Sequence, residues 1–469
     1  MSTKEDIGLS RKQRVFARIE SVVGTMVFPV GTTDFIRPVG NAGINQTPAF
    51  ADSEELSNTL DVLDQFQNAT PAGKWNLAMY LRPTGVLGAA ELIQGSVLLK
   101  VLQGLANEAT TAVVKDAVAS ATISTITIQT IAGGVMPVNG AINIAEAGAG
   151  GKVEKIHYTG ITRVSRTATA ATLTGCVRGY YSSTAATHSA ANVITLVSPF
   201  YRQATDSPTF SLWIETDHFV QGLSGCSIEN ATFDISNDGA VKVTMDGQGM
   251  QMVYAGTATL THACAATTQI IQVSDASRFS AGAYIYNSSA GTPVRLISTV
   301  DQTLNQITLS TTVQAATWAS GSIVRGYLPP GTEIGDPIES KDTVAKIDSV
   351  LAKIKTGSIA FKTPKKYIED EVGTEYPEDF LEDKRSISSS LGLYFRKSAA
   401  EYFTKGFDGD ESAVLITFGD TAGSIVDIYL PKCKLTVPTV NFASPAVELT
   451  IPISALGTVG EDSAEIVVR

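Results

Sequence analysis

A block of similar composition occurs twice in the chain, and this repetition constrains the fold more than any other feature of the sequence. The first copy, at residues 156–197, reads IHYTGITRVSRTATAATLTGCVRGYYSSTAATHSAANVITLV, and the second, at residues 297–325, reads ISTVDQTLNQITLSTTVQAATWASGSIVR. Both are rich in Thr, Ala and β-branched residues broken by Gly and Asn, and strong helix formers are sparse. This composition is typical of short β-strands joined by turns.

The two blocks can be aligned, with gaps, over a longer stretch of the chain. The matched positions are Gly140-Ala141-Ile142 with Gly282-Ala283-Tyr284, Val153 and Ile156 with Val294 and Ile297, Leu173 with Leu309, and Ala186-Thr187-His188 with Ala316-Thr317-Trp318. We therefore expect two small all-β modules of roughly 70 residues each, at 117–198 and 257–328. Because other sequence separates them, they cannot stack as a contiguous solenoid.

The rest of the chain predicts a mainly β core that accepts the modules as insertions. A chain of 469 residues is long enough for several compact units. We expect the core to be a β-sandwich or barrel with one or two helices, built from residues 19–116, 199–256 and 329–469. Residues 1–18 carry several cations, among them Arg11, Lys12 and Arg14, and few apolar side chains, which predicts an exposed arm that reaches neighbouring molecules.

Local patterns predict individual elements of this core. Alternation of apolar and polar residues predicts a strand at 73–82, and the same alternation around Asn237-Asp238-Gly239 predicts a β-hairpin at 228–248. The run SVVGTMVFPV, at 21–30, is expected to be a strand. A leucine stripe predicts a helix within 88–109, although Gly95 and Gly104 weaken it, and AAEYFTKGF, at 399–407, predicts a short helix.

Charge and apolar patterning exclude several classes of protein. A net charge of −11 excludes general affinity for nucleic acid, which depends on cations that displace counterions from phosphates. The N-terminus lacks the apolar core of a signal peptide, and the chain has no apolar run long enough to span a membrane, so we expect a protein made and kept in the cytoplasm without membrane insertion. The scattered cysteines Cys176, Cys226, Cys264 and Cys433 are expected to be buried small apolar residues.

No group of residues in the sequence predicts catalysis, a metal or a cofactor. The stretch AGAGGKV, at 147–153, lacks both the first glycine and the Ser or Thr of a phosphate-binding loop, so we interpret it as a turn. The four histidines, His157, His188, His218 and His262, have no metal-ligand spacing. We therefore expect a protein that is not an enzyme.

The segment KTPKKYIEDEVGTEYPEDFLEDKR, at residues 362–385, is the most highly charged part of the chain. Its basic start includes Lys365 and Lys366, and its acidic body includes Glu369, Asp370, Glu371, Glu378 and Asp379. One interpretation is a solvated loop. The other is a strap between subunits, with the basic start and acidic body meeting opposite charges on neighbouring molecules.

Several stretches of the core, in this order, resemble the tail tube (major tail) proteins of long-tailed bacteriophages. They are TLDVLDQFQ and GKWNLAMYLRP early in the chain, GCSIENATFDISNDGAVKVTMDGQG between the modules, DKRSISSSLGLYF, and the ending LPKCKLTVPTVNFASPAVELTIPISALGTVGEDSAEIVVR. The inserted blocks, with IHYTGIT, TLTGCVRG and TAATHSA, are similar to a small motif of phage tail and fibre proteins.

This resemblance implies a structural protein of the virion tail, assembled in the host cytoplasm. It implies a β-sandwich or barrel whose copies form stacked hexameric rings around a channel for DNA ejection, with the tape-measure, tail-terminator and tail-tip proteins as partners. DNA would pass without specific binding, and we expect Asp234, Asp246 and Lys242, on the polar face of the 228–248 hairpin, to line the channel.

The resemblance also places the two modules on the outer surface of the tube. Because a contractile sheath would collide with them, it favours the flexible, non-contractile tail of a siphophage. Tyr180, Tyr181 and Trp318 are candidates for stacking on host sugars there, although aromatic residues of small β modules are more often core residues. The alternative function is a tail-tip or fibre protein that binds the host surface through the modules.

Overall fold

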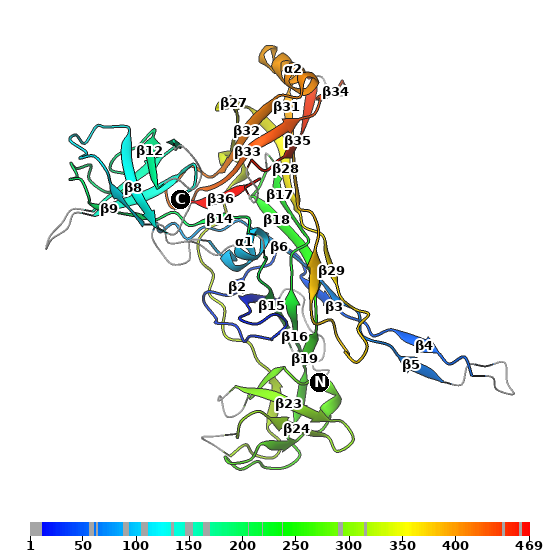
Figure 1. Ribbon diagram of the computed structural model, residues 1–469. Helices are drawn as coiled ribbons and strands as arrows, with labels where there is room; N and C mark the ends of the chain where they lie inside the picture. The colour runs from blue at the N-terminus through cyan, green and yellow to red at the C-terminus, as the bar shows by residue number, and fades with distance from the viewer. Residues whose placement is uncertain are drawn as a thin grey trace.

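The computed structural model confirms the mainly β prediction (Figure 1), with 49% of residues in strands and 6% in helices. It describes residues 12–55, 61, 64–87, 93–104, 111–132, 136–145, 153–162, 169–204, 206–217, 219–236, 238–288, 294–313, 317–442, 446–458 and 462–469. Arg11, His218, Asn237, Ala316 and the 147–152 turn lie outside the described residues.

One long antiparallel sheet forms the main body of the core. Its strands, in spatial order, are β27 (Val350–Ala352), β26 (Val344–Ile347), β32 (Glu411–Phe418), β33 (Val426–Leu435), β35 (Glu448–Ala455), β31 (Ser386–Tyr394), β28 (Ile354–Lys362), β17 (Asn230–Ile235), β18 (Lys242–Gly249), β6 (Gly73–Tyr80) and β3 (Gly43–Asn45). Beside them, β34 (Thr439–Asn441) pairs with β35, and β36 (Glu465–Val468) joins β33 to β14 (Phe200–Arg202). The sheet therefore combines all three predicted parts of the core.

A smaller sheet packs beside the long one and includes a strand that the sequence did not predict. Its order is β19 (Met252–Ala255), β16 (Phe219–Cys226), β15 (Phe210–Thr216), β1 (Arg14–Ile19) and β2 (Phe35–Ile36). Because β1 is a central strand with Val15, Phe16 and Ala17 fully buried, the prediction of an exposed arm is wrong for this part of residues 1–18.

Two of the basic residues that suggested an exposed arm, Lys12 and Arg14, instead form ion pairs at the ends of this small sheet. Arg14 pairs with Glu215, and Lys12 Nζ lies 2.8 Å from Asp217. The run at 21–30 is not a strand; it is a loop held by the buried carboxylate of Glu20, which accepts hydrogen bonds from Gly24 N and Gly225 N.

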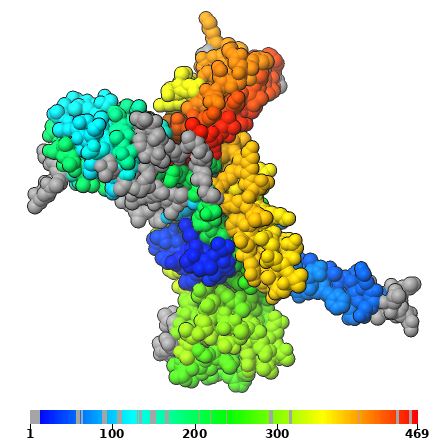
Figure 2. Space-filling model, in the orientation of Figure 1, coloured from blue at the N-terminus to red at the C-terminus, as the bar shows by residue number. Residues whose placement is uncertain are grey.

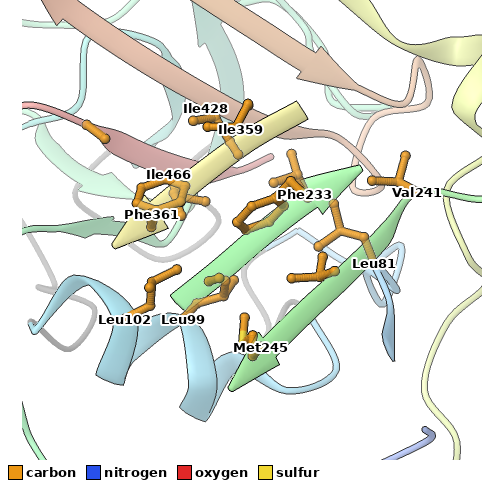
Figure 3. Packing of buried hydrophobic residues seen from close by; sticks show 14 of the residues in the cluster. Leu81, Leu99, Leu102, Phe233, Val241, Met245, Ile359, Phe361, Ile428 and Ile466 are labelled. Carbon is orange, nitrogen blue, oxygen red and sulfur yellow. The ribbon is translucent and has the colours of Figure 1, made fainter. Parts of the chain in front are cut away.

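Side chains of the long sheet and of a short helix form the centre of the core (Figure 3). The helix, α1 (Ser96–Gln103), buries Leu99 and Leu102 against this cluster, which also contains Met245 and Phe361. It is shorter than the predicted 88–109 because Gly95 and Gly104 bound it with φ of 76° and 77°. The second helix, α2 (Ala400–Asp408), confirms the short helix predicted at 399–407.

The two inserted modules have the same strand topology. Module 1 contains β7 (Thr111–Val114), β8 (Ile126–Ala132), β9 (Gly140–Ala145), β10 (Val153–Tyr158), β11 (Gly160–Thr162), β12 (Ala170–Thr174) and β13 (Val193–Leu196). Module 2 contains β20 (Thr257–Thr259), β21 (Ile270–Gln272), β22 (Tyr284–Asn287), β23 (Arg295–Asp301), β24 (Gln306–Leu309) and β25 (Ile323–Gly326). The pairs β7 with β13, β13 with β9, β9 with β10 and β12 with β8 correspond to β20 with β25, β25 with β22, β22 with β23 and β24 with β21.

Each module closes into a small barrel. In module 1 the first two strands, β7 and β8, pair directly, and in module 2 the bridge between Leu260 and Val273 makes the equivalent contact. Module 1 begins at Thr111, before the expected boundary at residue 117, because β7 pairs with β13. The apolar interior of module 1 forms a separate cluster, whereas that of module 2 is continuous with Phe16 and Trp213 of the small sheet.

Two short hairpins complete the molecule. One, β29 (Lys365–Tyr367) with β30 (Phe380–Glu382), lies within the charged segment. The other, β4 (Phe50–Asp52) with β5 (Gln65–Gln67), stands clear of the body, as the space-filling view shows (Figure 2). The 3₁₀ turns lie at Ala276–Arg278, Ser340–Asp342 and Lys397–Ala399.

Candidate functional site: surfaces for assembly

The residues proposed from sequence to line a channel lie together on the polar face of the long sheet. The β17–β18 hairpin forms as predicted, with Phe233 and Val243 buried. Asp234 lies directly opposite Lys242 in the register, and Asp246 Oδ2 accepts a hydrogen bond of 2.7 Å from Asn230 Nδ2. Asp234 and Lys242 therefore oppose each other across the strands, and Asp246 gives these three residues a net negative charge.

The polar face continues beyond the hairpin and includes a row of small side chains. One row across β18, β17, β28, β31 and β35 consists of Thr244, Thr232, Ala360, Ser388 and Ser454. None of these five residues is buried, whereas the residues directly before and after each of them on the same strand are buried, with the exception of Ala455. This row presents hydroxyls and methyl groups and no large side chain, and Lys362 lies in the next row of the same face.

The charged segment is partly built into the body, which corrects its interpretation as a fully solvated loop. Tyr367 is buried, and its hydroxyl hydrogen-bonds Gly225 O at 2.7 Å and Ser227 Oγ at 2.9 Å. The side chain of Lys365 is only 1% exposed, and its Nζ lies 2.9 Å from Glu382 Oε1. Burial lowers the pKa of Lys365, although the Glu382 carboxylate opposes that shift. Lys365 is therefore an internal partner and is not available to a neighbouring subunit.

The other charged residues of this segment remain at the surface. Lys366, Glu369, Asp370, Glu371, Glu378 and Asp379 are all exposed. Glu369 also contributes to the fold, because its Oε1 accepts a hydrogen bond of 2.8 Å from Ala72 N. The acidic surface predicted for a contact between subunits is thus present on an anchored hairpin.

A buried polar network joins module 1 to the long sheet. Asn139 Nδ2 donates to Asp427 Oδ2 at 2.9 Å, Arg469 also donates to Asp427, and His157 Nε2 donates to Asn139 Oδ1 at 2.8 Å. Burial, reinforced by the charge of Arg469, lowers the pKa of His157 to about 3. A cavity of about 430 Å³ adjoins the network and is also lined by Lys346. His157 is therefore neutral in this joint at neutral pH.

Inside module 1, a buried carboxylate on β10 holds the segment that connects β12 to β13. Glu154 is fully buried and accepts hydrogen bonds from Arg178 Nε at 2.8 Å, His188 Nε2 at 2.7 Å, Gly179 N at 2.9 Å and Ala186 N at 3.0 Å. Burial alone would raise the pKa of Glu154, but these donors outweigh it and lower the pKa to about 2. The aligned residue of module 2 is Arg295, which donates to Thr312 O instead.

The aromatic residues suggested for contacts with host sugars do not form an outer binding surface. Trp318 is completely buried in the core of module 2. Tyr180 packs against the central core cluster, and the Tyr181 hydroxyl donates to Gly85 O at 2.6 Å. Both tyrosines therefore hold module 1 against the core.

The sequence analysis missed two apolar surfaces. The β4–β5 hairpin exposes Phe50 and Phe66. At the α2 end of the long sheet, Leu351, Tyr394 and Phe407 are exposed. The repeated Phe in the short runs PAFAD and DQFQ was a local signal for the hairpin, but the second surface comes from separate parts of the chain.

The described residues contain no group of three or more His, Cys, Asp or Glu side chains that could hold a metal ion. No helix within these described parts is long and apolar enough to cross a membrane. A scan of protein-family models gives no match to the chain, and a search of curated proteins gives none either.

Proposed function

We propose that the chain is the subunit of a phage tail tube, which assembles into stacked hexameric rings around a channel for DNA. The observation that carries this proposal is the polar face of the long sheet. A wall rich in cations would bind phosphates and retard the genome, whereas this face combines small hydroxyl side chains with two carboxylates, Asp234 and Asp246, beside its lysines Lys242 and Lys362.

The ends of the two sheets supply the means of assembly. β27 and β3 are edge strands of the long sheet, and β19 and β2 are edge strands of the small one. Unpaired edges are a liability in a monomer, and closing a ring of subunits removes them. In this ring the two modules project outward, because each lies outside the main body of the core (Figure 1).

Electron microscopy of the purified protein in negative stain tests the proposal. We expect rings or stacked rings with a central hole and peripheral knobs. Particles that stay compact and never polymerise at high concentration would contradict it.

Thiol labelling tests the position of the polar face in those assemblies. The four native cysteines are buried, so an introduced cysteine gives a clear signal. A bulky thiol reagent should label Leu304→Cys on module 2 in tubes and should label Ser388→Cys much more slowly in tubes than in monomers. Equal labelling of Ser388→Cys in both states would place the polar face outside the channel.

A tail-tip or fibre protein remains the second candidate, because the two barrels of the same topology are suited to repeated surface contacts. Stoichiometry in the virion separates the two functions. A tube subunit is among the most abundant virion proteins, and a tip protein is among the rarest.

A further inference from the structure

The β4–β5 hairpin exposes apolar side chains on both of its faces. In its register Phe50 lies opposite Gln67 and Phe66 lies opposite Ala51, so the two rings point to opposite faces of the ribbon. Phe50 is 60% exposed and Phe66 is 58% exposed. A two-stranded ribbon of this kind is marginally stable alone and gains stability when another surface covers it.

All the charged side chains of the hairpin are also acidic. Residues 46–70 contain Asp52, Glu54, Glu55, Asp61 and Asp64 and no lysine or arginine. A surface that covers the hairpin must therefore offer apolar side chains together with positive charge.

A groove at the α2 end of the long sheet has both properties. It is a cavity of about 240 Å³ between β27, β31 and α2, and its lining includes Leu351, Lys353, Tyr394 and Arg396. Leu351 is 55% exposed and Tyr394 is 41% exposed. β27 is also the edge strand of the sheet, so the groove lies where pairing in the long sheet ends.

The cations of this groove have no described carboxylate as an ion-pair partner. Lys353, Arg396 and the adjacent Lys397 are exposed, and none forms an ion pair with a described residue. The carboxylates nearby are largely engaged, because Asp348 pairs with Lys405 and Glu448 pairs with Lys355. The two carboxylates of α2, Glu401 and Asp408, are exposed. The rim of the groove is therefore positive.

We propose that the β4–β5 hairpin of one copy docks into this groove on a second copy of the chain. Phe50 or Phe66 covers Leu351 and Tyr394, and the acidic residues of the hairpin face Lys353, Arg396 and Lys397. Since the donor and acceptor surfaces differ, the contact is heterologous and propagates from copy to copy as a ring or a stack. The inference rests on the proposed self-assembly and names the contact that drives it.

Charge reversal tests the contact directly. The hairpin variant Asp52→Lys/Glu54→Lys/Glu55→Lys should raise the concentration needed for assembly by about tenfold or more, because like charges then face each other. The groove variant Lys353→Glu/Arg396→Glu/Lys397→Glu should do the same. A chain that carries both sets should regain much of the assembly. Light scattering measures the threshold concentration, and hydrogen exchange on the monomers checks that each variant is folded.

A matched control and the unmodified protein separate this inference from the proposed tube. Leu304→Ala removes an equally exposed apolar side chain from module 2 and should leave the threshold unchanged, whereas Phe50→Ala/Phe66→Ala should raise it. If the charge-reversed hairpin variant formed tubes at an unchanged threshold concentration, the hairpin contact would be refuted and the proposed tube would not. If the protein formed solid filaments without a central hole, and charge reversal abolished these filaments, the result would support the hairpin contact and refute the tube. An unmodified protein that stays monomeric at all concentrations would refute both.

Discussion

Replacing Glu154 with Gln should selectively destabilise module 1. The substitution keeps the shape of the side chain but removes the charge that Arg178 and His188 contact. The folded-state pKa of about 2, against an ordinary 4.5, corresponds to about 3 kcal/mol of stabilisation of the charged form at neutral pH. Breaking a buried ion pair by removing one partner costs about 3 to 5 kcal/mol, which agrees with this value.

Hydrogen exchange resolved by peptide measures this loss where it occurs. A change of about 3 kcal/mol increases the opening of the module about a hundredfold or more. Exchange should accelerate in β8, β9 and β12, while β22 and β24 of module 2 stay protected because the interiors of the modules are separate. Tryptophan fluorescence would not report the loss, since Trp75, Trp213 and Trp318 all lie outside module 1.

The matched control is Glu371→Gln, which changes an exposed carboxylate in the charged segment. It should leave exchange in module 1 unchanged. If Glu154→Gln also left protection in β8 and β9 unchanged, the buried carboxylate would not stabilise the module and the reasoning would fail.

Three further predictions concern pH, a buried lysine and a close backbone contact. His157 has a folded-state pKa of about 3, so the unfolded state binds more protons than the folded state between pH 6.5 and 3. The joint between module 1 and the core should therefore weaken as the pH falls through that window. Equal protection of the β10 amides from hydrogen exchange at pH 7 and pH 4.5 would contradict this. Lys365→Ala leaves Glu382 without one of its two cations and should lower the free energy of unfolding by about 1 to 3 kcal/mol. Urea unfolding measures this change, and an unchanged midpoint of the unfolding curve would show that the ion pair contributes nothing. In Gly247→Ala the new Cβ would lie 2.0 Å from Ser227 O, so the substitution should destabilise the fold by about 1 to 3 kcal/mol. Gly239→Ala, in the open hairpin turn, should destabilise it less. The reverse order of the two variants in thermal unfolding would refute this account.

Elements whose pattern is local could be predicted from the sequence. β6 and the two strands of the β17–β18 hairpin alternate buried residues with half-buried or exposed ones over their whole length, so the period of two sufficed. The repeated block likewise indicated two β modules, and their strand pairings are the same. The buried state of all four cysteines was also predicted correctly.

Features that depend on distant partners could not be predicted. Arg14 resembled part of an exposed arm because its partner, Glu215, lies far along the chain on a neighbouring strand. Lys365 stands in a highly charged segment, and its burial depends on the hairpin that brings Glu382 alongside it. Trp318 had a plausible surface role only until the closed barrel placed it inside.

Both modules enter and leave the core through hydrogen-bonded neighbours. Thr111 at the start of module 1 lies opposite Thr195 near its end, and Thr257 at the start of module 2 lies opposite Arg325 near its end. The two ends of each module therefore lie side by side, and a short linker can join them without stretching the core. Removing module 2 would uncover Phe16 and Trp213, which share its interior, so module 1 is the easier of the two to replace. The same two positions are therefore suitable sites for displaying a foreign domain on every subunit of an assembly.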